Sequence, residues 1–239
     1  MVVNSLILLV MMQSVAPPPP LTAPEIVERM VARDNERLAS LSGYTGMRTY
    51  RFENKRFNKR AEMTVRVVCD SAGGKTFEVT AEKGSGFVRN RIIRKMLDAE
   101  REASRKGDHE QTRIIPVNYD FRLVSHEILD GRAVYVLGIS PKTENKFLIC
   151  GRVWIDAEDL AISRIEGRPA KNPSFWIRSV NVVHRYARTG QFWLPVMNES
   201  KAKARVFGPT ELAIEYFDYV THVRDAHAAG PAGAEELSQ

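Results

Sequence analysis

The sequence predicts a mainly β (α+β) protein, a half-open antiparallel β-barrel of about ten or eleven strands with helices covering its concave face. Three observations predict this fold. Segments in which apolar and polar residues alternate follow one another through most of the chain. Short turn sequences join these segments, as in antiparallel hairpins. Two segments with helical spacing interrupt them, and each has an apolar stripe that needs a sheet face to pack against.

The bulk composition is that of a globular protein. Of 239 residues, 44% are hydrophobic and 27% are charged, which argues against a disordered or fibrous chain. This length suits one large all-β domain. The formal net charge of +6 fits binding to nucleic acid, contact with an anionic membrane surface, or solubility alone. We expect no nucleic-acid partner, because no recognised binding motif is present.

Residues 1–20 are expected to be a signal peptide and a proline-rich linker, ahead of a single domain at 21–224. Residues 6–12 form an unbroken apolar run, shorter than the roughly 20 residues that span a bilayer. Small residues at 14–16 and four prolines follow. This order is typical of a secretory signal and predicts the periplasm of a Gram-negative-type envelope. Because no Lys or Arg precedes the apolar run, a disordered apolar tail is the alternative interpretation.

A helix is predicted from Thr22 to about Leu41. Thr22 suits the N-cap, Pro24 the first turn, and Glu25 completes a capping box. Apolar residues then recur at helical spacing. Three strands at about 44–52, 63–70 and 77–81 follow, each with alternating polarity, as in an antiparallel sheet with one buried face.

A second helix is predicted from about residue 87 to 106, inserted among the strands. Its apolar residues fall on one side of a helical wheel: Val88, Ile92, Ile93, Met96, Leu97, Ala99 and Ala103. Arg89 and Glu100 lie within this stripe. Unpaired buried charge is costly, so they should pair with each other or with backbone groups. A polar contact to a lipid headgroup is the functional alternative.

The remaining strands are predicted at 118–129, 132–140, 146–156, 160–167, 174–187, 191–206 and 211–222. Asp130-Gly131, Thr189-Gly190 and the acidic residues at 156–159 supply the turns. Within 196–206 the odd positions are mostly charged and should face water, while the even positions, largely small, face inward. In the next strand Leu212, Ile214, Tyr216 and Val220 share a face. Residues 225–239 are expected to be a disordered tail.

Two phrases in this run resemble a known family. They are Val-Trp-Ile-Asp-Ala-Glu-Asp-Leu-Ala-Ile-Ser-Arg-Ile-Glu at 153–166 and Gly-Gln-Phe-Trp-Leu-Pro at 190–195. With the capped helix and the interrupted meander, they resemble the LolA/LolB/RseB superfamily of periplasmic lipoprotein-localisation factors, including its "outer membrane lipoprotein-sorting protein" members. The resemblance covers about residues 23–222. It implies an unclosed barrel lidded by helices, with a hydrophobic cavity that takes lipoprotein acyl chains in characterised members, and no catalytic residues.

The candidate ligand-binding residues are apolar side chains of the inserted helix, tryptophans, and one strand face: Phe87, Ile92, Ile93, Met96, Leu97, Trp154, Trp176, Leu212, Ile214 and Tyr216. Ordinary core packing is the simpler explanation of these residues, and for the tryptophans packing in the core or covering the strand surface. Basic residues gather around the first hairpin: Arg48, Arg51, Lys55, Arg56, Lys59, Arg60 and Arg66. They form either a solvated loop or a rim for anionic headgroups during transient membrane contact.

Motifs for catalysis or metal binding are missing from the sequence. The five histidines have no ligand spacing, and no nucleophile elbow, phosphate loop or dinucleotide fingerprint occurs. We therefore expect no enzyme, no cofactor and no metal. Cys69 and Cys150 are an even number in an oxidising compartment, so a disulfide and two free thiols are both open.

These features predict a carrier or chaperone that binds a lipid or an acylated lipoprotein, as a monomer. The alternative is an RseB-like sensor or scaffold that binds a membrane-anchored regulatory protein.

Overall fold

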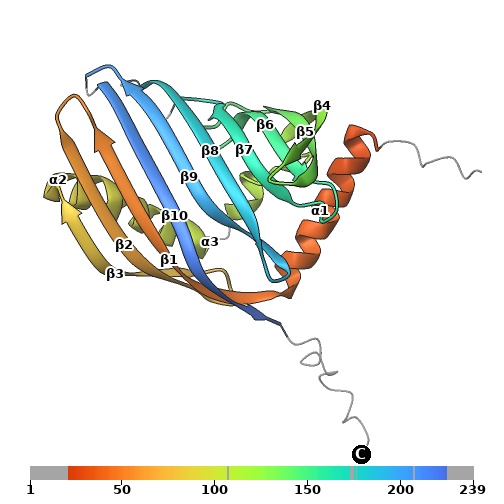
Figure 1. Cartoon of the computed structure of the whole chain (residues 1–239), viewed down its shortest axis with the longest axis horizontal. Coiled ribbons are helices and arrows are strands. Elements are labelled where there is room, and N and C mark those ends of the chain that lie inside the picture. The colour runs from red at the N-terminus through yellow and green to blue at the C-terminus, as the bar shows by residue number, and fades with distance from the viewer. Residues whose placement is uncertain (1–20, 107, 173–174, 176, 207, 225–239) are drawn as a thin grey trace, which may run out of the picture.

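The computed structural model describes residues 21–106, 108–172, 175, 177–206 and 208–224. The expected signal peptide at 1–20 and tail at 225–239 lie outside the described residues. The strands in the described part of the chain form one ten-stranded sheet with the order β3-β2-β1-β10-β9-β8-β7-β6-β5-β4. Every neighbouring pair is antiparallel, and the sheet curves without closing (Figure 1). The predicted half-open antiparallel fold is confirmed.

The strand bounds agree with the predicted segments to within a few residues at most ends, with β1, β2 and β3 longer than expected. The strands are β1 (Leu41–Asn54), β2 (Lys59–Cys69), β3 (Lys75–Gly84), β4 (Tyr119–Leu129), β5 (Arg132–Pro141), β6 (Ile149–Asp156), β7 (Ile162–Pro169), β8 (Ile177–Thr189), β9 (Phe192–Ala204) and β10 (Gly208–Val223). The meander runs in sequence order except at one place, where the last strand, β10, pairs with the first, β1. This pairing joins the two hairpin groups into one sheet.

Local turn chemistry explains the hairpins. Asp130 and Gly131 have φ of 50° and 79°, and this left-handed pair matches the twist of β4 and β5. Between β6 and β7, the Asp156 carboxylate accepts hydrogen bonds from the backbone N–H groups of Glu158, at 3.1 Å, and Asp159, at 2.7 Å. The predicted turn role of Asp156 is confirmed.

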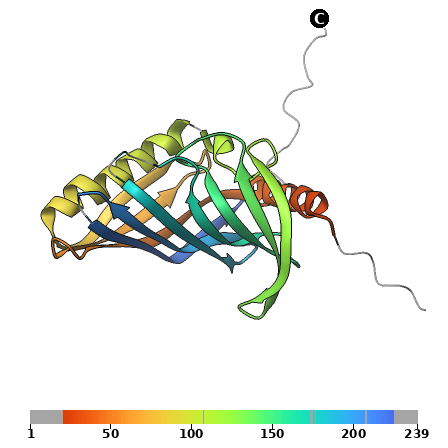
Figure 2. The ribbon, with the colours of Figure 1, turned by 90° about the horizontal axis from the view of Figure 1, so that it is seen from above.

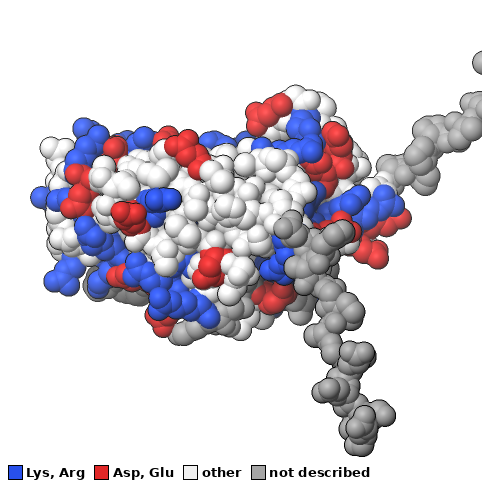
Figure 3. Space-filling view, turned by 90° about the horizontal axis from the view of Figure 1, so that it is seen from below, with Lys and Arg blue, Asp and Glu red and all other residues white. Residues whose placement is uncertain are grey.

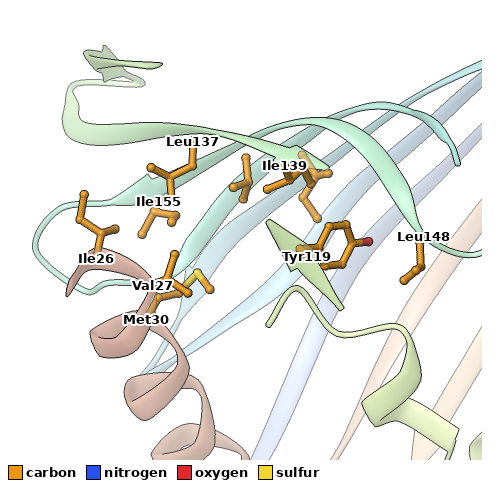
Figure 4. Packing of buried hydrophobic residues seen from close by; sticks show 10 residues of the cluster. Ile26, Val27, Met30, Tyr119, Leu137, Ile139, Leu148 and Ile155 are labelled. Atoms are coloured by element: carbon orange, nitrogen blue, oxygen red, sulfur yellow. The ribbon is translucent and has the colours of Figure 1, made fainter. Parts of the chain in front are cut away.

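The first helix, α1 (Ala23–Ser40), covers one end of the sheet. Its start is fixed by Glu25, whose carboxylate accepts a hydrogen bond of 2.8 Å from the Thr22 backbone N–H. Ile26, Val27 and Met30 point from α1 into a core formed with β4 to β7 (Figure 4). The rest of that core is Tyr119, Leu137, Ile139, Leu148, Val153, Ile155 and Ile165.

The inserted helix covers the other end. It consists of α2 (Gly86–Val88), one π-helical turn, η1 (Arg89–Ile93), and α3 (Arg94–Lys106), followed by the short 3-10 helix η2 (Asp108–Gln111). Val88, Ile93 and Leu97 pack on β1 and β2, chiefly against Tyr50, Ala61, Met63, Val65 and Val67. Figure 2 shows this helix along one side of the curved sheet and α1 at the far end. The two helices therefore pack over two separate hydrophobic cores at opposite ends of the sheet. The middle strands of the sheet lie between these two cores.

One predicted face is wrong. Val220 is 56% exposed, although the alternation from Leu212 and Tyr216 places it inside. The cause is a bulge in β10, because Thr45 pairs with Val220 while Met47 pairs with Phe217. Asp218 within it has φ of 54°, and the extra residue reverses the alternation. Tyr219 takes the inward place, with its ring edge against Tyr44.

Candidate functional site

An apolar groove of about 610 Å³ lies between the start of the inserted helix and the ends of β1, β8, β9 and β10. Its lining is Phe52, Asn54, Phe57, Lys59, Phe87, Val88, Arg91, Ile92, Ile177, Ala202, Ala204 and Thr210. Two candidate residues from the sequence, Phe87 and Ile92, are among them. The volume is in the range of ligand-binding pockets, roughly 300–1,000 Å³.

The alternation of β9 produces one wall of this groove. Lys201 and Lys203 are exposed, while Ala202 and Ala204 face the groove. Small side chains at these two positions leave the space that larger ones would fill. The predicted inward direction of the small even positions is thus confirmed here.

The mouth of the groove carries exposed aromatic rings. Phe87 is 69% exposed on the first turn of the helix, and Phe57 is 48% exposed in the β1–β2 turn. Ser85 holds the helix start, because its side-chain oxygen accepts the Val88 backbone N–H at 3.5 Å. Large apolar side chains that stay exposed beside an apolar groove are typical of a binding surface.

The other candidate residues lie elsewhere. Ile93 and Leu97 are buried under the helix, where Met96 and Ile214 pack against the same core. Leu212 is half-buried on β10. The remaining tryptophan candidates are not in the groove: Trp176 lies outside the described residues, and Trp154 packs against Val134 and Val136 while its indole N–H donates to Glu127 at 3.1 Å.

Tyr216 belongs to a buried polar network that fastens the helix to the middle of the sheet. Arg48, only 4% exposed, donates hydrogen bonds of 3.0 and 2.9 Å to the two carboxylate oxygens of Glu100. Its guanidinium also lies 4.9 Å from the centre of the Tyr216 ring. Lys75 binds the same Glu100 carboxylate at 2.8 Å. Two cations on the sheet therefore share one carboxylate on α3.

The charge state of Glu100 follows from these contacts. Burial disfavours its ionised form, but the charges of Lys75 and Arg48 outweigh that cost and lower the pKa of Glu100. Of the two pairings expected for Arg89 and Glu100, with each other or with backbone groups, the pairing with each other is wrong. Arg89 instead pairs with Glu82 on β3, which also binds Arg94 at 2.7 Å. The π-helical turn at 89–93 precedes α3, so local helix geometry differs from the ideal wheel on which that expectation rested.

A second cavity, of about 430 Å³, lies under α1 and was not anticipated from the sequence. Its walls include Met30, Leu38, Ile165, Tyr186 and Leu194. Burial raises the pKa of the Tyr186 hydroxyl to about 12, so this group is neutral at physiological pH. The apolar stripe of α1 was the only sequence feature that pointed to this cavity. It could not locate the cavity, because the strands that α1 covers depend on the strand order of the whole sheet.

The described residues were not found to form a metal site or a membrane-spanning helix. Among the described residues no group of three or more His, Cys, Asp or Glu side chains is placed to hold a metal ion. Within that same part of the chain, no helix is long and apolar enough to cross a membrane. Cys69 on β2 and Cys150 on β6 are free thiols, and five strands of the sheet separate them.

Comparison with known proteins gives structural neighbours only. No protein-family model and no curated protein sequence matches the chain. A DUF1329 family protein from Desulfovibrio piger is similar with a TM-score of 0.46 and 12% identity, over 87% of this chain and 95% of that one. A LolA superfamily protein from Nitrosomonas europaea has a TM-score of 0.37 and 10% identity, over 86% and 95%. The Pseudomonas aeruginosa MucA/MucB complex has a TM-score of 0.30 and 13% identity, over 80% and 93%.

Proposed function

We propose that this protein is a periplasmic carrier or chaperone that holds the acyl chains of a lipid or lipoprotein in the groove, without catalysis. The groove lining supports this most directly. Eight of its twelve residues are Phe, Val, Ile or Ala, and it opens to solvent beside exposed Phe57 and Phe87. The apolar run at 6–12, followed by small residues, supports export.

The size of the hydrophobic effect determines how long an acyl chain must be to bind in this groove. Each buried methylene contributes about 0.8 kcal/mol, so ten contribute about 8 kcal/mol. Association costs about 4–15 kcal/mol in lost freedom. Short chains should therefore bind weakly, and affinity should rise steeply with acyl length until the groove is filled.

Native mass spectrometry of gently purified protein tests the proposal. We expect a co-purified lipid or acylated species, and the free protein should then bind saturated fatty acids with affinity rising about threefold to fourfold per methylene. Protein without lipid that also fails to bind fatty acids of any length would contradict it. A stoichiometric protein partner recovered from periplasmic extract, with no lipid, would favour the RseB-like sensor or scaffold instead.

Release of ligand is proposed to require movement of the inserted helix, because α2 and η1 form one wall of the groove. The helix is held by its apolar packing on β1 and β2 and by ion pairs, of which Arg94 to Glu82 is one. A thiol-specific crosslinker joining Glu82→Cys to Arg94→Cys, with Cys69 and Cys150 replaced by Ser, should slow ligand exchange about tenfold or more. Each single-Cys variant with the same reagent is the control. Unchanged exchange in the crosslinked protein would rule out this movement.

A further inference from the structure

The end of the sheet that lies opposite α1 carries both the mouth of the groove and three exposed aromatic rings. The β1–β2 turn, the β9–β10 turn and α2 lie at this end, opposite α1 (Figure 1). Phe57 and Phe87 border the groove, and Phe175, which is 75% exposed, lies two residues before the groove residue Ile177. A cluster of large exposed apolar side chains around one opening indicates a surface that contacts another apolar phase.

Basic side chains surround these rings. Arg56 lies over the Phe57 ring at 5.7 Å, and Arg205 lies over the Phe175 ring at 5.0 Å. Lys59 and Arg91 belong to the groove lining itself. Figure 3, with the same end at its left, shows several Lys and Arg side chains along the outline there.

Among the described residues these four cations differ from their neighbours on the hairpin, which pair with carboxylates. On the same hairpin Lys55 binds Glu211 at 3.4 Å and Arg60 binds Glu53 at 3.0 Å. Within the described part of the chain, no salt bridge involves Arg56, Lys59, Arg91 or Arg205. The mouth therefore presents positive charge that the fold itself leaves uncompensated.

We propose that this mouth docks on the surface of an anionic phospholipid bilayer, with Phe57 and Phe87 at the headgroup level and the four cations on lipid phosphates. Aromatic rings favour the membrane interface, and each basic residue near an anionic surface strengthens binding about fivefold. Four such residues give reversible attachment, which suits a protein that must leave again. The inference rests on the proposed function in one respect: docking brings the groove against the bilayer, so that an acyl chain enters without crossing water.

Vesicle co-sedimentation of the full chain tests the docking. The probes are phosphatidylcholine vesicles with and without phosphatidylglycerol. We expect the wild-type protein to bind the anionic vesicles at least about a hundredfold more tightly than the neutral ones. Any contribution of residues 1–20 is common to all variants and is measured by the neutral vesicles. Equal binding to both vesicles, or none to the anionic ones, would overturn the proposal.

Two cations that are outside the groove lining separate docking from ligand binding. Arg56→Gln with Arg205→Gln should weaken binding to anionic vesicles about 25-fold and leave fatty-acid affinity in solution unchanged. Arg29→Gln with Arg66→Gln makes the same charge change at two exposed sites on α1 and on β2, and should lose less than about threefold. Equal losses in the two double variants would mean general electrostatics and would overturn the proposed surface.

Two other outcomes would separate docking on a bilayer from ligand binding and from binding to a protein. If vesicle binding depends on Arg56 and Arg205 while no fatty acid binds in solution, docking stands and the proposed function fails. If pure lipid vesicles bind nothing but vesicles made from whole membrane extract retain the chain, the partner at this surface is a protein, and the bilayer proposal is wrong.

Discussion

Arg132 donates a hydrogen bond of 2.8 Å from Nη2 to the Oδ1 atom of Asp156, and its Nε contacts Oδ2 of the same carboxylate. Arg132 begins β5 directly after the Asp130-Gly131 turn, and Asp156 ends β6. Asp156 is fully buried and also holds the 156–160 turn through backbone N–H groups. One carboxylate thus joins two neighbouring hairpins, which places the phrase at 153–166 in register with the strand beside it.

Asp156→Ala should lower the free energy of unfolding by about 3 kcal/mol, because it removes several charge-assisted hydrogen bonds and leaves two backbone N–H groups of the turn without this acceptor. Urea denaturation followed by circular dichroism measures the change. Glu158→Ala, in the same turn but with an exposed side chain, should stay within about 0.5 kcal/mol of wild type. Equal effects of the two substitutions would contradict a special role for Asp156.

Acid should weaken the attachment of α3 to the sheet. The pKa of Glu100 is lower in the folded protein than its ordinary value of 4.5, because Lys75 and Arg48 outweigh its burial. A lowered folded pKa means that this contribution is complete above the unfolded pKa and is lost as the pH falls through the folded pKa. The contribution of Glu100 to the urea midpoint should therefore hold from neutral pH down to about pH 4.5 and be lost as the pH falls further.

Glu100→Gln should be less stable than wild type at neutral pH and show a shallower fall in acid. Glu144→Gln, at an exposed carboxylate in the β5–β6 loop, should retain the wild-type profile. If Glu100→Gln kept both the neutral stability and the acid dependence of wild type, the network of Arg48, Lys75 and Glu100 would contribute nothing measurable.

Two glycines face each other where β6 and β7 approach closely. Gly151 pairs with Gly167, and a Cβ atom at Gly151 would lie 2.6 Å from the Gly167 Cα atom and still closer to the Glu166 carbonyl oxygen. Gly151→Ala should therefore cost about 2 kcal/mol or more in unfolding free energy, since backbone must move. Gly131→Ala has space around it but a φ of 79°, so it should cost about 1 kcal/mol, and Gly131→Asn should recover most of that. Equal urea midpoints for Gly151→Ala and wild type would contradict the close approach.

The parts of the fold that the sequence predicts well depend on neighbouring residues. Asp130-Gly131 and the Asp156 turn act over a few residues, and the capping box of Thr22 and Glu25 spans one turn of helix. These signals locate the strands and helices regardless of their partners. The alternation in β9 also predicts that the Ala202 side chain faces inward.

The parts that sequence reasoning missed depend on pairings between distant residues. The bulge at Asp218 exists because β10 pairs with β1, more than 150 residues earlier in the chain. Glu100 meets Arg48 across 52 residues, so its partner could not be read from the helix alone. Of the groove lining, the candidate ligand-binding residues included only Phe87 and Ile92, because Phe57 reaches the groove from the β1–β2 turn and Ile177 from β8.

Filling the groove should weaken ligand binding strongly without unfolding the protein. Ala202→Phe would place a large ring in the space between β9 and the inserted helix, and we expect fatty-acid affinity to fall about tenfold or more. The ring has open groove to occupy, so the loss of unfolding free energy should stay within about 1–3 kcal/mol. Fluorescent fatty-acid displacement gives the affinity, and urea denaturation the stability.

Lys203→Phe is the matched control, since it adds the same ring one residue further along β9, on the exposed face. It should leave fatty-acid affinity within about twofold of wild type, because the alternation of a strand directs this side chain away from the groove. Equal affinity losses in both variants would mean that the ring acts through the strand rather than through the groove. Wild-type affinity in folded Ala202→Phe would show that acyl chains bind elsewhere, and the cavity under α1, next to Met30 and Tyr186, would be the place to test next.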